Sequence, residues 1–124
     1  MIRDLIRNDI GGYLENPPTS IVWNIFCYLL RREISSGQIT LVDTDMCVYG
    51  TPWKKPTRFA IWGPGRFDVK LDRCHPCGKI CSTSGKEHVQ LVGQVNGVWR
   101  TSLGQIYPHR LVRKLFDPLA KSSF

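Results

Sequence analysis

The chain has 124 residues, 42% of them hydrophobic, which suits one folded domain with one core and is too apolar for a disordered tail. Its 17 Lys and Arg exceed its 10 Asp and Glu by seven, a balance that favours polyanionic partners, nucleic acid first and an anionic membrane surface second. Its longest apolar stretch, residues 21–30, is interrupted by Asn24 and is far shorter than the ~20 residues of a bilayer span, so no membrane insertion is expected.

In the first part of the chain, the residue pattern predicts a short helix followed by a strand, a second helix and a second strand. Apolar residues at helical spacing predict a short helix over residues 2–10, and a short strand then ends at Pro17. A helix over residues 20–34 and a strand over residues 39–42 follow. This order within about 30 residues is typical of a parallel βαβ unit.

The second part predicts a strand over residues 58–62, a hairpin and a final helix. Residues 88–92 and 98–101 flank an Asn-Gly pair, which is a strong hairpin signal. The final helix, near residues 108–116, has one apolar and one basic face. The apolar face is formed by Leu111, Val112, Leu115 and Phe116, and the basic face by His109, Arg110, Arg113 and Lys114.

Residues 46–59, MCVYGTPWKKPTRF, are predicted to form a loop between two strand-like runs, and this loop combines Gly and two prolines with a Trp and a pair of lysines. Trp53, Lys54 and Lys55 project from a turn built by Gly and Pro, and an aromatic ring beside cations suits a nucleic-acid backbone with an unstacked base. The alternative is an exposed loop whose Trp53 packs on the core. The predicted nucleic-acid contacts are Trp53, Lys54, Lys55, Arg58, Arg110, Arg113 and Lys114.

Four potential metal ligands lie within 15 residues of the second part. Cys74, Cys77, Cys81 and His88 have the spacing C-x2-C-x3-C-x6-H, which could close a tetrahedral zinc site of three thiolates and one imidazole. His75 is a competing ligand. The alternative is a set of reduced thiols near the hairpin, with His88 starting a strand.

The remaining cysteines carry no reactive motif. Cys27 lies in an apolar helix and is predicted to be core, and Cys47 beside the loop is predicted to be structural. Five cysteines make an odd number, and the N-terminus has no signal-peptide core, so we expect no disulfides and an intracellular protein, cytoplasmic or nuclear.

Two motifs occur in the order found in cytosine-5 DNA methyltransferases. ENPPTSIVW at residues 15–23 and CVYGTPWKKPT at residues 47–57 resemble segments of the divergent methylase-like proteins of phages and mobile elements. The resemblance implies an α/β fold, a partial Rossmann-like methyltransferase sheet with a small cysteine-rich, zinc-binding β-hairpin extension. It also implies two catalytic residues: Glu15, which would contact the ring nitrogen of a flipped cytosine, and Lys55, which would hold the base or nearby backbone. From the residues alone, the favoured interpretation is that Glu15 is a solvated loop residue and Asn16 a turn former.

The chain departs from that family in what precedes the first motif. Only 14 residues stand before Glu15, so the family's Gly-rich cofactor segment and Pro-Cys nucleophile loop are not in this chain. The resemblance therefore implies a partial DNA methyltransferase-like domain that is inactive alone and would need a separate chain to supply S-adenosylmethionine and the nucleophile. Residues 1–66 would form the methyltransferase-like segment and residues 67–124 the cysteine-rich hairpin and basic helix, within one compact domain.

Two other functions fit the same residues. One is a non-catalytic, zinc-stabilised nucleic-acid-binding module, and the other is a basic subunit of a ribonucleoprotein, with RNA in place of DNA. In each case a half-sheet would leave strand edges and apolar helix surface open, so we expect a partner chain or a homodimer.

Overall fold

The computed structural model describes residues 1–75, 79–90, 94–95, 98–99 and 107–122. The helices are α1 (Ile2–Arg7), α2 (Val22–Leu29), α3 (Arg31–Ser35) and α5 (His109–Ser122), with two 3-10 turns, η1 (Met46–Tyr49) and η2 (Arg66–Asp68). The strands are β1 (Gly12–Asn16), β2 (Ile39–Asp45), β3 (Pro56–Trp62), β4 (Gln94–Val95) and β5 (Val98–Trp99). In the described part of the chain, no helix is both long enough and apolar enough to cross a bilayer.

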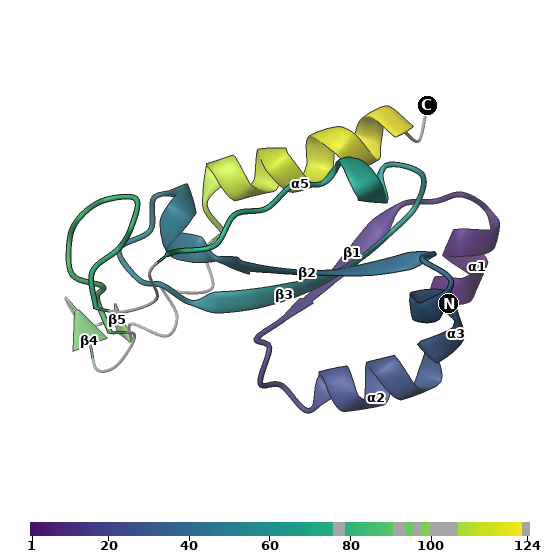
Figure 1. The fold of residues 1–124 in the computed structure, drawn as a ribbon, viewed down its shortest axis with the longest axis horizontal. Coiled ribbons are helices and arrows are strands. Elements are labelled where there is room, and N and C mark those ends of the chain that lie inside the picture. The colour runs from purple at the N-terminus through teal and green to yellow at the C-terminus, as the bar shows by residue number, and fades with distance from the viewer. Residues whose placement is uncertain (76–78, 91–93, 96–97, 100–106, 123–124) are drawn as a thin grey trace.

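The main sheet has the order β1-β3-β2, and β3 runs antiparallel to both neighbours (Figure 1). Phe59 of β3 lies opposite Glu15 on one side and Val42 on the other. The expected parallel βαβ pairing is therefore wrong: β1 and β2 point the same way, but β3 separates them. Among the described strands the sheet is antiparallel and not Rossmann-like, so the fold is a small mixed α/β domain.

The central position of β3 follows from its composition. Phe59, Ala60 and Ile61 are completely buried, which requires cover on both faces and a strand on each edge. The edge strands are less buried, and β1 has no fully buried residue. The most apolar run of the chain thus occupies the middle of the sheet, with Pro56 at its exposed first position, where no ladder donor is lost.

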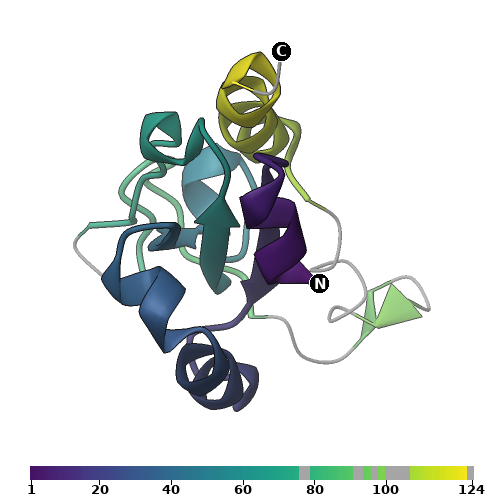
Figure 2. The same cartoon turned by 90° about the vertical axis from the view of Figure 1, so that its right-hand side faces the viewer.

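Alternate residues of β3 enter two separate cores. Phe59 and Ile61 face α5, and Ala60 and Trp62 face α2 and α3, as the period of two in a strand requires. Figures 1 and 2 show α5 on one side of the sheet and α2 on the other. The core beneath α5 contains Met46, Tyr49, Phe59, Ile61, Val69, Leu111, Leu115 and Leu119, and the core above α2 contains Trp23, Phe26, Leu30, Ile39, Ala60 and Trp62.

The helices differ from their predicted bounds. The single helix expected over residues 20–34 is divided at Leu30, whose φ of −114° departs from helical geometry. The last helix extends beyond residue 116 and contains Pro118. On its predicted apolar face Leu111 and Leu115 are buried, whereas Phe116 is 48% exposed and meets the ring of Tyr13 edge-on.

The predicted hairpin is confirmed in position, and residues 91–92 and 100–101 of its predicted strands lie outside the described residues. β4 and β5 pair antiparallel on either side of residues 96–97. Residues 88–90 are not strand, because the backbone N–H of His88 donates to the carbonyl of Lys79 and this segment belongs to the cysteine-rich turn instead.

The turn after β3 depends on close contact between two glycines. Gly63 has φ of +107°, a conformation that L side chains rarely adopt, and a Cβ there would overlap the Cα of Gly11. This contact allows the link between α1 and β1 to lie directly against the end of β3.

Candidate metal centre and the groove beside it

Three thiols and one imidazole meet at the end of β2. The ligand atoms of Cys47, Cys74, Cys81 and His88 all lie within 4.8 Å of one another, and Cys74 Sγ is 3.7 Å from His88 Nε2. A tetrahedral zinc ion with bonds of about 2.3 Å to sulfur separates its ligands by about 3.8 Å. The three thiols are buried and His88 is 9% exposed, so the four side chains could hold a metal ion away from solvent.

The end of β2 positions the first two ligands. Cys47 lies in η1, the 3-10 turn that directly follows β2. The N–H of Cys74 donates to Oδ2 of Asp45, the last residue of β2, at 2.9 Å. Asp45 is itself completely buried and pairs with Arg73 at 3.0 Å. Both cysteines are thus anchored to the same strand end.

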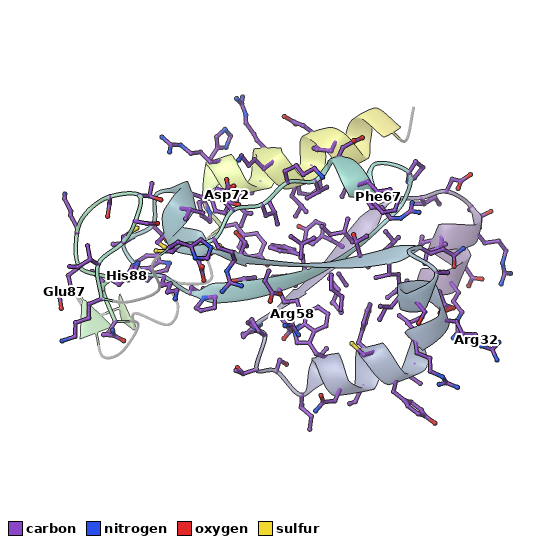
Figure 3. All side chains as sticks on the ribbon, viewed as in Figure 1. Arg32, Arg58, Phe67, Asp72, Glu87 and His88 are labelled. Carbon is purple, nitrogen blue, oxygen red and sulfur yellow. The ribbon has the colours of Figure 1, made fainter. Side chains whose placement is uncertain are left out.

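A short backbone turn supplies the other two ligands. The N–H of Cys81 donates to the carbonyl of Lys86 at 2.8 Å, and the N–H of His88 donates to the carbonyl of Lys79 at 2.6 Å. A bridge between residues 80 and 87 lies between these bonds. Figure 3 shows His88 beyond the end of the sheet, in this turn.

The thiols differ in how firmly they hold a proton. Burial opposes the ionisation of Cys81, but backbone N–H groups of Ser84 and Thr83 outweigh it and lower the pKa of Cys81 to about 6. The pKa of Cys74 is also lowered, because hydrogen bonds from Ser82 outweigh burial. Burial raises the pKa of Cys47, and the neighbouring sulfurs Cys74 and Cys81 raise it further. Thiolates crowded at a buried site favour a bound cation.

Among the described residues, the cluster contains three of the four predicted ligands and one residue that was not predicted. Cys74, Cys81 and His88 converge as the spacing indicated, and Cys77 lies outside the described residues. The prediction missed Cys47, because it is remote in sequence and only the end of β2 brings it to the others. The competing ligand His75 is exposed and outside the cluster.

The remaining cysteine of the described residues takes no part in the cluster. Cys27 is partly exposed on α2, which differs from the predicted core position. It is therefore a natural control for any experiment on the cluster.

A groove of about 520 Å³ adjoins the cluster, and we refer to it as the lysine groove. It is lined by Trp53, Lys54, Lys55, Pro56, Lys79, His88, Val89 and Gln90. His88 belongs to both features, and the N–H of Val89 donates to the carbonyl of Pro52 at 2.8 Å, which joins the two walls. None of these lining residues is acidic, so the groove is electropositive.

Trp53 combines the two alternatives that its sequence position left open. Its ring is partly buried and packs against the core beneath α5, and it also lines the lysine groove. Its buried indole N–H has no acceptor among the described residues. Packing against the core positions the ring at the groove wall.

The two predicted catalytic residues lie near the same end of the sheet. Glu15 is on β1, and its Oε2 accepts a hydrogen bond of 2.6 Å from the hydroxyl of Tyr107. Burial, and then the Glu15 carboxylate, raise the pKa of Tyr107. Lys55 precedes β3 and lines the lysine groove.

The remaining predicted nucleic-acid contacts lie away from the groove. Arg58 is between the sheet and α2 in Figure 3, where it donates to both carboxylate oxygens of Asp43, at 2.7 and 3.2 Å. Arg110, Arg113 and Lys114 are exposed on α5, and Lys114 pairs with Asp72 at 3.0 Å. The structure thus brings Trp53, Lys54 and Lys55 together and leaves the arginines elsewhere.

Comparisons with known protein families, curated proteins and solved structures find no match to this chain. The resemblance to cytosine-5 methyltransferases therefore stays a prediction.

Proposed function

We propose that this protein is a nucleic-acid-binding module stabilised by one zinc ion. The observation that carries the proposal is the lysine groove: lysines from two separate segments line one hollow beside a Cys3His cluster, with no lining carboxylate.

The donor set of the cluster favours zinc. Thiolate and imidazole ligands in a tetrahedral arrangement suit Zn²⁺, whereas Mg²⁺ and Ca²⁺ prefer oxygen. Four protein ligands also leave no open position, which is typical of a structural rather than a catalytic zinc site. The expected role of the ion is to hold η1, Cys74 and the turn at residues 79–88 together.

The lining of the groove favours a nucleic-acid strand. Lys54, Lys55 and Lys79 can each neutralise a phosphate, and the ring of Trp53 offers an apolar surface to a base. Because His88 is both a cluster ligand and a groove residue, the proposal links metal binding to nucleic-acid binding.

The first test is salt-dependent binding of a labelled single-stranded DNA, followed by fluorescence anisotropy. Three phosphate contacts predict a slope of log K against log salt of about −2, since each contact to a single strand contributes about −0.7. The double variant Lys54→Ala, Lys55→Ala should reduce that slope to about −0.7. Arg110→Ala with Arg113→Ala on α5 is the matched control. A DNA affinity that does not depend on salt, or that is the same in the lysine double variant as in the wild-type chain, contradicts the proposal.

A second test uses the shared ligand. Removal of zinc by a chelator should abolish DNA binding by the wild-type chain, and added zinc should restore it. A DNA affinity that does not depend on zinc would contradict the link between metal binding and nucleic-acid binding.

A methyltransferase-like role is the second candidate. It is favoured by the position of Glu15 near the end of β1, at the same end of the sheet as Lys55. The proposal is that a separate chain with the Gly-rich and Pro-Cys segments completes an enzyme that methylates cytosine in DNA. Mixing the two chains should then produce methylation that is lost in Glu15→Gln. The absence of any neighbouring reading frame with those segments would refute it.

A further inference from the structure

The outer side of α2 carries a row of exposed apolar side chains, which we call the α2 stripe. Ile21, Ile25, Tyr28 and Leu29 are 72%, 57%, 69% and 59% exposed. Their spacing of i, i+4, i+7 and i+8 places them on one side of the helix. Trp23, on the other side, is buried against the sheet.

In the described part of the chain, the four side chains of the α2 stripe belong to neither hydrophobic core. A helix that is apolar all round is normally covered on all sides, and contiguous exposed apolar residues mark interaction surfaces. Figures 1 and 2 show α2 on the far side of the sheet from α5, with its outer side turned away from the other labelled elements. The zinc centre and the lysine groove lie elsewhere, so this surface is independent of the proposed function.

Arginines border the stripe at its C-terminal end. A hollow of about 330 Å³ there is lined by Arg3, Leu29, Arg31, Arg32 and Glu33. Arg3 donates to the Glu33 carboxylate at 2.6 Å, so the one acidic side chain among these residues already has a cationic partner. The rim therefore presents a surplus of guanidinium groups beside an apolar stripe.

The two rim arginines nearest the stripe are suited to binding carboxylates. Arg31 lies over the Tyr28 ring, 5.1 Å from its centroid, and donates to the Tyr28 carbonyl. Arg32 is exposed and forms no side-chain hydrogen bond or ion pair with the described residues; Figure 3 shows it on the outside of α3. Planar guanidinium groups bind carboxylates in bidentate pairs.

We propose that the α2 stripe and its arginine rim dock an acidic amphipathic helix of a partner protein. Apolar residues of such a helix would lie along Ile21, Ile25 and Tyr28, and its carboxylates would pair with Arg31 and Arg32. A second copy of this chain fits less well, because the only acidic residue lining the hollow is held by Arg3. A flat membrane would leave the hollow at the end of the stripe unfilled.

The test uses the full zinc-loaded chain and a labelled helical peptide of about four turns, with Leu at i, i+4 and i+7 and Glu at the flanking positions. We expect saturable binding, with a Kd in the range of about 1 to 100 μM. Ile25→Glu should weaken binding about tenfold or more, because it places a carboxylate in the centre of the contact. The double variant Arg31→Glu, Arg32→Glu should bind the Glu peptide more weakly than the wild-type chain does, and should bind a matched Lys peptide more tightly.

The control is Arg110→Glu with Arg113→Glu on α5, which should leave peptide binding unchanged. Every variant is checked for zinc content and circular dichroism, and Ile25→Glu should keep wild-type DNA affinity. Absence of saturable binding, or equal binding of the Glu and Lys peptides by the wild-type chain, overturns the proposal. Two other results would also overturn it. If Ile25→Glu abolishes a concentration-dependent dimer, the occupant is a second copy of the chain. If it abolishes binding to phosphatidylserine vesicles, the occupant is a membrane.

Discussion

Replacing Cys47 by serine tests the metal centre most directly. In the structure Cys47 is one of four side chains that could hold a metal ion, whereas sequence spacing alone places Cys77 in that role. A hydroxyl is a poor zinc ligand beside a thiolate. We therefore expect Cys47→Ser to lose stoichiometric zinc and Cys77→Ser to retain it, because Cys47, Cys74, Cys81 and His88 already complete a tetrahedral site.

The size of the effect follows from the ligand number. Structural zinc sites of four ligands have apparent binding free energies of about 10–16 kcal/mol, so one ligand accounts for about 2.5–4 kcal/mol, which at its upper end is close to a thousandfold in affinity. At a free zinc concentration a thousand times the wild-type Kd, zinc stabilises the wild-type chain by about 4.1 kcal/mol and the variant by about 0.4 kcal/mol. At about 4 °C per kcal/mol, zinc raises the wild-type Tm by about 16 °C and the variant Tm by about 2 °C.

The assay is thermal unfolding with zinc and with a chelator, together with elemental analysis. Comparison within each protein cancels the cost of burying a serine hydroxyl at position 47, which is present in both conditions. Cys27→Ser is the matched control, because Cys27 lies on α2 outside the cluster and should keep the full zinc effect. A wild-type Tm that ignores zinc, or a Cys47→Ser variant with the full zinc effect, would refute the ligand assignment.

Three further predictions concern pH and stability. Burial and the neighbouring sulfurs raise the pKa of Cys47, so zinc binding at neutral pH should release a proton and zinc affinity should rise with pH. Calorimetry of zinc binding in buffers of different ionisation enthalpy measures the released proton. Binding heats that do not depend on the buffer would contradict this prediction. The hydrogen bond from Arg58 lowers the pKa of Asp43, so the pair stabilises the fold above the unfolded-state pKa of about 3.9 and loses that contribution as pH falls through the lower folded-state value. Asp43→Asn should thus cost about 1 kcal/mol in urea unfolding at pH 7, since the pair is partly exposed, and a cost that persists at pH 2 would argue against the ion pair. Gly63→Ala should destabilise the fold by more than the roughly 1–3 kcal/mol of backbone strain alone, because its Cβ would also overlap Gly11. Gly37→Ala is the control for strain alone, since Gly37 also has positive φ but no atom lies near its Cβ. Equal costs in the two variants would mean that the contact between Gly63 and Gly11 is unimportant.

Local patterns in the sequence were enough to predict most elements. Apolar spacing located α1, α2 and α5, and the Asn-Gly pair located the β4–β5 hairpin. These signals depend on residues only a few positions apart, so they are readable without the fold. The division of α2 from α3 at Leu30 has no comparable signal, since the surrounding residues are ordinary helix formers.

The pairing of strands was decided by tertiary structure. A strand, a helix and a strand in sequence are compatible with direct parallel pairing and with a third strand between them. The choice depends on β3, which lies beyond the loop and contributes Phe59, Ala60 and Ile61, three consecutive apolar residues that are all completely buried. Burying that run on both faces and both edges outweighs the local preference for adjacent parallel strands.

The metal centre shows the same division at the level of single residues. The spacing of Cys74, Cys81 and His88 marks a metal site in the sequence, because ligands close along the chain can converge through one turn. Cys47 joins them only because β2 ends where Cys74 is bound to Asp45, a contact across 29 positions that no local pattern encodes. The kinds of ligand and the basic loop are therefore readable in the sequence, whereas the fold brings Cys47 to the cluster and places Lys79 beside Lys54 and Lys55. Side-chain chemistry belongs to single residues, but convergence of distant residues depends on the packing of the whole sheet.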